Sequence, residues 1–573
     1  MIGELNPGLI LIVGALLIPV APQFLRGVIT LVLPIIAAYH LVNLPLGNMG
    51  IIPLFGYELV TLRVDRLSFI FGLIFLLAAF MAAIYALHVK GWVEAMTSQM
   101  YAGSAVGAVF AGDLVTLFVF WEITAITSVF LIWARRTESA FNTGMRYLVI
   151  QVGSGVILLA GVMLHAHATG SIAFDQIGKI TLDSDWSTVP IATWLILLSF
   201  GIKAAFPLLH NWLQDAYPEA TVSGTVWLSA FTTKLAIYAL ARGFAGSDLL
   251  VPIGATMTAF PIFYAVIEND LRRVLAYSLN NQLGFMVVGV GIGTELAISG
   301  AAAHAFCHII YKALLFMSMG AVLYRVGTVK GSELGGLHKS MPWTTVFCII
   351  GAASISAFPL FSGFVSKSLI ISAAMKEGYF WTWLILLFAS AGVFHHSGIK
   401  IPYFAFFAHD SGKRCQEAPF NMLLAMAIAA ALCIGIGVAP GMLYDILPYD
   451  VTYQAYTTEH VLTQLQLLLF SALAFAVLMQ TGLYPPELKS TNLDSDWFYR
   501  RLGYNIAATL LLMSRETWRG LSRAATAAVS RLERNINRSH NPESVLGRTW
   551  PTGLMAFWAT VMLGAYLVLL YFR

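Results

Sequence analysis

Three ionisable side chains recur at four-residue spacing within one apolar stretch of the sequence. His304, His308 and Lys312 lie between Ala297 and Arg325, a run long enough to cross a bilayer. Three helical positions four residues apart drift by only about 80° in total, so the side chains share one face and climb roughly 12 Å. Histidines and lysines inside a membrane often form proton relays. The spacing predicts such a relay, with structural hydrogen bonding and a metal pair as alternatives.

The metal alternative has little support from the neighbouring residues. Ala305, Phe306 and Cys307 separate the histidines, without the glutamate of an HExxH motif, and no acidic third ligand is near. The cysteines are scattered without metal spacing, at positions 307, 348, 415 and 433. No glycine-rich run fits a phosphate-binding motif. We therefore predict no metal site and no cofactor.

Further ionisable residues lie inside other apolar runs. Glu122 is near the middle of a run that opens at Asp113, where a charge costs about 2.5 to 3.5 kcal/mol on insertion scales. The lysines outside the loops would together cost on the order of 12 to 18 kcal/mol, comparable to the stability of a whole domain. They are Lys203, Lys234, Lys312, Lys367 and Lys400. Such a cost predicts a function, with Asp215, His396 and Lys400 as accessory candidates.

Two of the lysines stand near an internal proline. Lys203 lies one turn before Pro207, and Lys367 follows Pro359. Proline removes a backbone donor and clashes with the preceding turn, so both helices should break and leave carbonyl groups free. Broken helices at membrane depth usually line a polar cavity. Their occurrence in both halves of the chain predicts a transport fold.

The elements that must position these residues are transmembrane helices. The 573-residue chain is 58% hydrophobic and only 11% charged, whereas soluble domains are about 25% charged. Sixteen apolar runs, two of them short, can cross about 30 Å of hydrocarbon. They begin near Gly8, Leu25, Arg66, Met96, Asp113, Gly144, Ile191, Val222, Leu249, Arg272, Ala297, Thr344, Tyr379, Phe420, His460 and Pro551. We predict an all-α polytopic membrane protein with about 14 to 16 transmembrane helices.

The distribution of basic residues and the order of the spans predict orientation and internal repeats. Odd-numbered loops hold twelve lysines and arginines and even-numbered loops five, so we expect the odd loops to be cytoplasmic and both termini outside. Five spans per half make the second repeat inverted. The expected divisions are N-terminal helices (1–95), a first repeat (96–243), an inverted repeat (249–408), two further helices (409–484), a lateral segment (485–550) and an anchor helix (551–573).

The lateral segment is basic and amphipathic. Eight arginines lie between positions 494 and 538, and the apolar residues, among them Leu510, Trp518 and Leu532, fall largely on one helical face. This pattern is typical of a helix lying along the cytoplasmic interface, the alternative being a solvated linker.

With these residues in view, the chain resembles the antiporter-like subunits shared by respiratory complex I and Mrp-type cation/proton antiporters. The resemblance covers roughly Asp65 to Ala408. Its motifs are Trp121-Glu122, Gly201-Ile202-Lys203 through Asp215-Ala216-Tyr217-Pro218, Thr233-Lys234, Asp270 to Ser278, His304 to Lys312, and Gly363 to Lys367. Lys234 and the surroundings of Lys203 are most similar to the MrpD-like members. The lateral helix and anchor resemble the NuoL-like branch of complex I, which has an aspartate where this chain has Ser154.

The resemblance implies two inverted five-helix repeats with half-channels joined by a central charged chain. By position, Glu122 would pair with Lys203. The implied proton-transfer residues are Glu122, Lys203, Lys234, His304, His308, Lys312 and Lys367. Protons would be exchanged for Na⁺ in a complex with Mrp A-, B-, C-, E-, F- and G-like subunits, in the lipid of a bacterial inner membrane and without nucleic acid.

Two other classes of function remain open at this point. One is a proton-pumping membrane subunit of a redox-driven complex, such as complex I or a hydrogenase-like complex. In either case the chain would be an ion-transport subunit that carries no redox centre of its own. The other is a scaffold whose charges only hold helices together.

Overall fold

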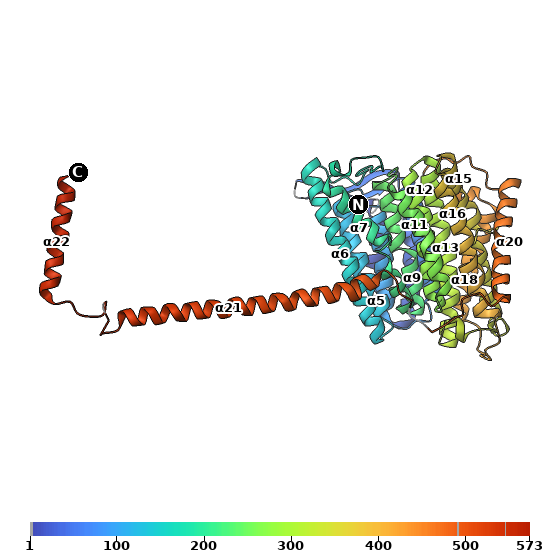
Figure 1. The fold of residues 1–573 in the computed structure, drawn as a ribbon. Coiled ribbons are helices and arrows are strands. Elements are labelled where there is room, and N and C mark those ends of the chain that lie inside the picture. The colour runs from blue at the N-terminus through green and yellow to red at the C-terminus, as the bar shows by residue number, and fades with distance from the viewer. Residues whose placement is uncertain (1–3, 55, 490–491, 545, 573) are drawn as a thin grey trace. The chain divides into compact units, whose positions relative to one another are not determined.

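The chain is almost entirely helical in the computed structural model, which describes residues 4–54, 56–489, 492–544 and 546–572. It divides into two compact units, Met1–Asn492 and Leu493–Arg573. In the first unit the long helices pack side by side as a bundle (Figure 1). All of the candidate site residues belong to this unit.

Ten helical segments among the described residues are long and apolar enough to cross a bilayer. They are α2 (Gln23–Val42), α3 (Arg66–Tyr85), α5 (Leu114–Trp133), α6 (Glu138–Thr169), α11 (Leu250–Ile267), α13 (Glu295–Val326), the segment Phe380–Phe407, α18 (Phe420–Val438), α20 (Thr458–Gln480) and α22 (Thr552–Tyr571). The membrane-spanning class predicted from the sequence is confirmed.

The other six predicted spans fall on helices that are short, broken or less apolar. They are α1 (Pro7–Ala15), α4 (Trp92–Val109), α7 (Ile191–Lys203) with α8 (Asn211–Glu219), α9 (Val222–Ala230) with α10 (Thr232–Gly243), α12 (Leu271–Ile292), and α14 (Pro342–Ile355) with α15 (Ser362–Lys376). Four of the ten candidate residues lie on this second set, namely Lys203, Asp215, Lys234 and Lys367. The other six lie on α5, α13 and the segment Phe380–Phe407 of the first set.

A β-hairpin adds to the predicted all-α fold. β1 (Gly47–Leu54) pairs antiparallel with β2 (Tyr57–Val64), and Met49 lies opposite Leu62. Leu62 and Val64 are buried while the residue between them is half-buried. This period-2 burial is typical of a strand with one face against a core.

Both predicted helix breaks are present and share one backbone conformation. Ala205 and Leu208 between α7 and α8 have φ of 61° and 69°, and Ala357 and Leu360 between α14 and α15 have φ of 57° and 73°. At each break the N–H of the phenylalanine before the proline donates to a carbonyl five residues earlier, at 3.0 Å. The left-handed residues turn the chain where proline prevents helical continuation. The same turn therefore occurs once in each half.

The helices before the two breaks also correspond. An aspartate caps α5 and another caps α12, because Asp113 and Asp270 each accept two backbone N–H bonds in the first turn. The next helices, α6 and α13, are both 32 residues long and end at a left-handed glycine. This shared order supports two repeats of one helical unit.

Helix α13 lies at the centre of the first unit. It packs against α3, α9, α12, α14, α15 and α18, and every residue from Ala297 to Val322 is buried. His304, His308 and Lys312 on this helix are therefore enclosed by helices from both halves of the chain.

In the second unit, the described residues form two α-helices. A π-helical turn, η7 (Phe498–Gly503), leads into α21 (Tyr504–His540), a 37-residue helix, and α22 follows. The predicted amphipathic segment is thus a continuous helix followed by a span.

Candidate functional site

His304, His308 and Lys312, which we call the α13 ladder, are fully buried. The first of them, His304, contacts the second broken helix. His304, His308 and Lys312 all have no exposed surface. The Nδ1 atom of His304 lies 3.1 Å from the Oγ atom of Ser366 on α15, and its ring centroid is 6.2 Å from that of His308. The two histidines are therefore neighbours on one face, as the four-residue spacing predicted.

Tyr311 joins the ladder, although it was not among the residues predicted from the sequence. Its hydroxyl donates to Oε1 of Gln282 on α12 at 3.1 Å and lies 3.4 Å from Nε2 of His304. Its ring centroid is 5.3 Å from that of His308. A tyrosine seven residues after one histidine and three after another shares their helical face, and this spacing was the available signal.

The next two groups have unused hydrogen-bonding capacity. Among the described residues, no hydrogen-bond partner is present for either ring nitrogen of His308 or for the Nζ atom of Lys312. The charges of Lys234 and Lys312 both act electrostatically on His308. An unpartnered buried nitrogen is costly in a low-dielectric interior, so its presence favours a role in accepting and releasing protons.

Lys203 takes a partner other than the expected one. Its Nζ donates to the carbonyl oxygen of Trp121 on α5 at 2.7 Å and lies 4.4 Å from the centroid of a Trp121 ring. Glu122 is one residue further along, and its Oε1 has no hydrogen-bond partner among the described residues. The predicted direct Glu122–Lys203 ion pair is therefore not formed, although the two charges act on each other electrostatically.

Glu122 is instead packed against a glycine of α6. A Cβ built on Gly155 would fall 1.5 Å from Oε1 of Glu122. The absence of a side chain at Gly155 thus provides the space for the carboxylate. No sequence motif indicated this contact.

Lys234 lies just after an interruption that was not predicted from the sequence. Phe231 separates α9 from α10, and Lys234 is the third residue of α10. Its Nζ, fully buried, donates to the carbonyl oxygen of Ser229 at 2.6 Å. The lysine therefore satisfies a carbonyl near the end of α9.

Lys367 lies beside the second helix break, on the helix that follows the break. It lies on α15 and donates to the carbonyl oxygen of Ile355, the last residue of α14, at 3.0 Å. Its Nζ is also 3.4 Å from Oγ of Ser390. Lys203 ends the helix before its break, whereas Lys367 follows its break, so both ammonium groups lie beside a broken helix.

Two of the accessory candidates lie in different surroundings. Asp215 on α8 pairs with Arg146 of α6 at 3.8 Å. His396 is buried in the π-helical turn η5 (Phe394–Ile399), with Nδ1 2.8 Å from Oγ of Ser397, which donates to Ser278 on α12. The charges of Lys312 and Lys400 both act on His396.

Lys400 is held more tightly than the ladder residues. It begins α17 (Lys400–Pro402) and donates to the carbonyl oxygens of Val266 and Glu268 at the end of α11, at 2.7 and 2.6 Å. It also forms a 2.9 Å ion pair with Glu487. These contacts indicate that Lys400 holds the end of α11 and the segment around Glu487 together, and they do not favour a role for Lys400 in carrying protons.

The segment that contains Glu487 has a second ion pair. Lys489 lies 2.9 Å from Glu333. Hydrogen bonds from Lys489 and Thr328 lower the pKa of Glu333 to about 2. The ion pairs Lys400–Glu487 and Lys489–Glu333 therefore attach the segment around residues 487–489 to the rest of the first unit.

Comparison with known proteins identifies the family. The model described as NADH:quinone oxidoreductase/Mrp antiporter, transmembrane, matches residues 111–395. The D-type component of the Na⁺/H⁺ antiporter of Alkalihalophilus pseudofirmus is 32% identical over 350 residues, which are 58% of this chain and 70% of the relative. The chain belongs to this family. Hydrogenase-4 component B of Escherichia coli is 26% identical over 68% of this chain, and the chain spans 64% of its length.

Solved structures show the same fold. The Mrp complex of Dietzia sp. contains a chain with a TM-score of 0.75 and 23% identity, covering 92% of this chain and 63% of that one. A chain of the archaeal membrane-bound sulfane sulfur reductase has a TM-score of 0.67 and 25% identity, covering 80% of this chain and 98% of that one. These relatives are chains of multisubunit membrane complexes.

The family match separates the candidate residues into two groups. The matched residues 111–395 include eight of the candidates, namely Glu122, Lys203, Asp215, Lys234, His304, His308, Lys312 and Lys367. His396 and Lys400 lie just beyond the matched region. The accessory assignment of these two residues therefore has no support from the family match.

Proposed function

We propose that this family member is the proton-translocating subunit of a multisubunit Mrp-type Na⁺/H⁺ antiporter. The observation that carries the proposal is the set of buried lysines and histidines that lines both broken helices and α13. Their placement spans both halves, and the 32% identity to the D-type component of an antiporter supports the same activity. The chain would be a transport component and would hold no redox centre.

Proton transfer would depend on whether the Lys203 Nζ contacts the Trp121 carbonyl or the Glu122 carboxylate. In this structure the Lys203 Nζ donates to the Trp121 carbonyl and forms no direct ion pair with Glu122, and this is the arrangement from which the proton would leave. The proton would pass to Lys234 and across the α13 ladder to Lys367. Movement of Lys203 back to Glu122 would favour the charged amine again and reset the site.

The proposed location is the bacterial cytoplasmic membrane, with both termini outside. The excess of lysine and arginine in the odd-numbered loops supports this orientation. The partners would be Mrp A-, B-, C-, E-, F- and G-like subunits.

The test uses everted vesicles that contain the whole complex, with cation-dependent ΔpH as the readout. We expect Glu122→Ala and Lys203→Ala each to reduce this signal by at least tenfold while the complex still assembles. If both variants keep the wild-type signal, the mechanism is wrong.

A redox-driven complex is the second candidate function. The 26% identity to hydrogenase-4 component B over 68% of the chain favours it. Purification of the native complex distinguishes the two, because a redox-driven assembly brings Fe–S subunits with it, whereas an Mrp-type assembly does not.

A further inference from the structure

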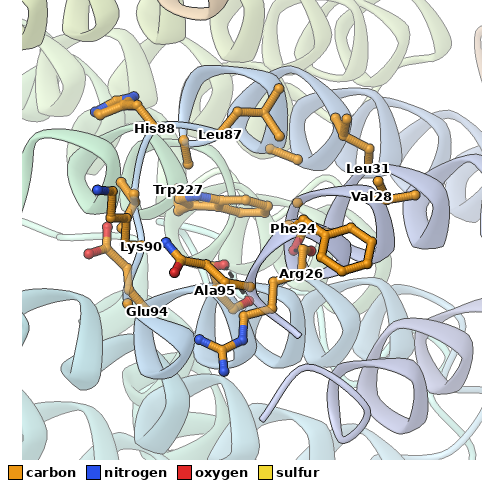
Figure 2. Close-up of a pocket in the computed structure, with 18 residues that line it drawn as sticks. Phe24, Arg26, Val28, Leu31, Leu87, His88, Lys90, Glu94, Ala95 and Trp227 are labelled. Carbon is orange, nitrogen blue, oxygen red and sulfur yellow. Dashed lines mark hydrogen bonds between the residues drawn. The ribbon is translucent and has the colours of Figure 1, made fainter. Parts of the chain in front are cut away.

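A pocket of about 770 Å³ lies between α2, α3 and α4, and its lining includes Lys90 and its neighbours in the segment before α4. Figure 2 shows the Glu94 carboxylate and the Trp227 ring among its lining side chains. Its polar lining residues include Arg26, His88, Lys90, Glu94 and Ser98. Glu94 is an acidic group that the mechanism above does not use.

The Glu94 carboxylate is held by hydroxyl groups from another helix. Thr221, the N-cap of α9, donates its hydroxyl to Oε1 of Glu94 at 2.8 Å, and the hydroxyl of Ser223 donates to the same oxygen. Arg26 approaches the pocket from α2, and His88 and Lys90 from the segment before α4. The carboxylate is therefore fixed where the pocket meets the helix that leads to Lys234.

Two further hydroxyl groups follow Glu94 along one face of α4. Ser98 and Tyr101 come four and seven residues later, so the face rises about 10 Å from the first to the last. Ser98 is buried in the pocket wall, and Tyr101 has no exposed surface. This face leads from the pocket into the bundle, and the Ser98 hydroxyl on it donates to the Ala95 carbonyl of its own helix at 2.9 Å.

The path ends at the interruption between α9 and α10. The Tyr101 hydroxyl lies 2.7 Å from Oγ1 of Thr232 and accepts the Thr232 N–H at 3.1 Å. Lys234 is two residues further along α10. Oγ1 of the intervening Thr233 has no hydrogen-bond partner among the described residues.

We propose that Glu94 exchanges protons between this pocket and Lys234, through Ser98, Tyr101 and Thr232. This inference rests on the proposed function and adds the mouth of one half-channel to it. Inward, Glu94 gives up its proton and returns to a carboxylate, each hydroxyl takes one proton and releases its own, and the neutral Lys234 amine becomes an ammonium. Outward, every transfer reverses.

The first test compares Glu94→Gln with Glu94→Asp in everted vesicles of the whole complex. The glutamine oxygen still accepts the two hydroxyl bonds but cannot carry a proton, so a purely structural role would leave transport intact. We expect Glu94→Gln to lower the initial rate of cation-dependent proton flux about tenfold and Glu94→Asp to stay within about threefold of wild type. Glu138→Gln, an exposed residue at the start of α6, is the matched control and should not change the rate.

The second test removes one hydroxyl from the path. Tyr101→Phe should lower the rate by a similar factor, whereas Tyr85→Phe, which removes an equally buried hydroxyl bonded to the Met317 carbonyl, should not. Dicyclohexylcarbodiimide should label Glu94 in the purified wild-type complex, as seen by mass spectrometry of the peptide.

The outcomes separate this inference from the proposed function. If Glu122→Ala abolishes flux while Glu94→Gln and Tyr101→Phe remain at the wild-type rate, the proposed function stands and this inference is overturned. If the wild-type complex itself shows no cation-dependent flux, the proposed function fails. Labelling of Glu94 would still report a protonatable carboxyl group reachable from the pocket, whereas absence of the label would contradict this inference.

Discussion

The contact between Glu122 and Gly155 gives a sharp test of the proposed proton path. A Cβ at Gly155 would fall 1.5 Å from Oε1 and 2.5 Å from Cδ of Glu122. Ordinary carbon contacts are about 3.5 to 4.0 Å, so in Gly155→Ala the carboxylate must retreat by about 2 Å. A displacement of this size can cost roughly 100-fold in a reaction that depends on alignment.

The helix itself should tolerate the substitution. Alanine is a better helix former than glycine by about 1 kcal/mol, and the clash is with the end of a flexible side chain. We therefore expect the complex to assemble with a melting temperature close to wild type, while cation-dependent proton flux in everted vesicles falls at least tenfold.

Two companion variants make the result decisive. Gly153→Ala lies on the same helix with nothing within 4 Å of the added Cβ, and it should transport at the wild-type rate. Adding Glu122→Asp to Gly155→Ala shortens the acid by one carbon–carbon bond, about 1.5 Å, and should recover part of the flux. Wild-type flux in Gly155→Ala, equal to that of Gly153→Ala, would refute the reasoning.

The remaining predictions concern the lysines, the ladder and the helix break. Lys312→Met should abolish flux but raise the melting temperature of the complex, because it removes a buried ammonium without a hydrogen-bond partner among the described residues; unchanged stability would contradict this. Lys400→Met should lower the melting temperature, since it breaks an ion pair and carbonyl contacts. Tyr311→Phe should slow flux about three- to tenfold without loss of assembly, and an unchanged rate would remove this tyrosine from the path. Leu208→Gly should stabilise the complex by about 1 kcal/mol because Leu208 has φ of 69° and is 68% exposed, whereas Leu198→Gly, within α7, should destabilise it, as thermal unfolding would show.

Local sequence signals were sufficient to predict the helix breaks and the relation of the ladder histidines. Pro207 and Pro359 each remove a backbone donor and disfavour helical continuation, although Pro34 and Pro261 lie within the continuous helices α2 and α11. Four-residue spacing places His304 and His308 on one face of any α-helix. The interruption at Phe231 carries no proline and was not predicted. The hairpin at residues 47–64 was also missed, because a short alternating stretch is weak beside long apolar runs.

The amino-acid sequence by itself determined the membrane class, the two broken helices and the residue types of the site. These follow from local properties, namely apolar length, proline chemistry and the cost of burying charge. Only the tertiary structure decided which partner each charged group takes. Lys203 binds the Trp121 carbonyl, Glu122 packs against Gly155, and Tyr101 meets Thr232, because hydrogen bonds depend on distances of a few tenths of an ångström between helices far apart in the chain.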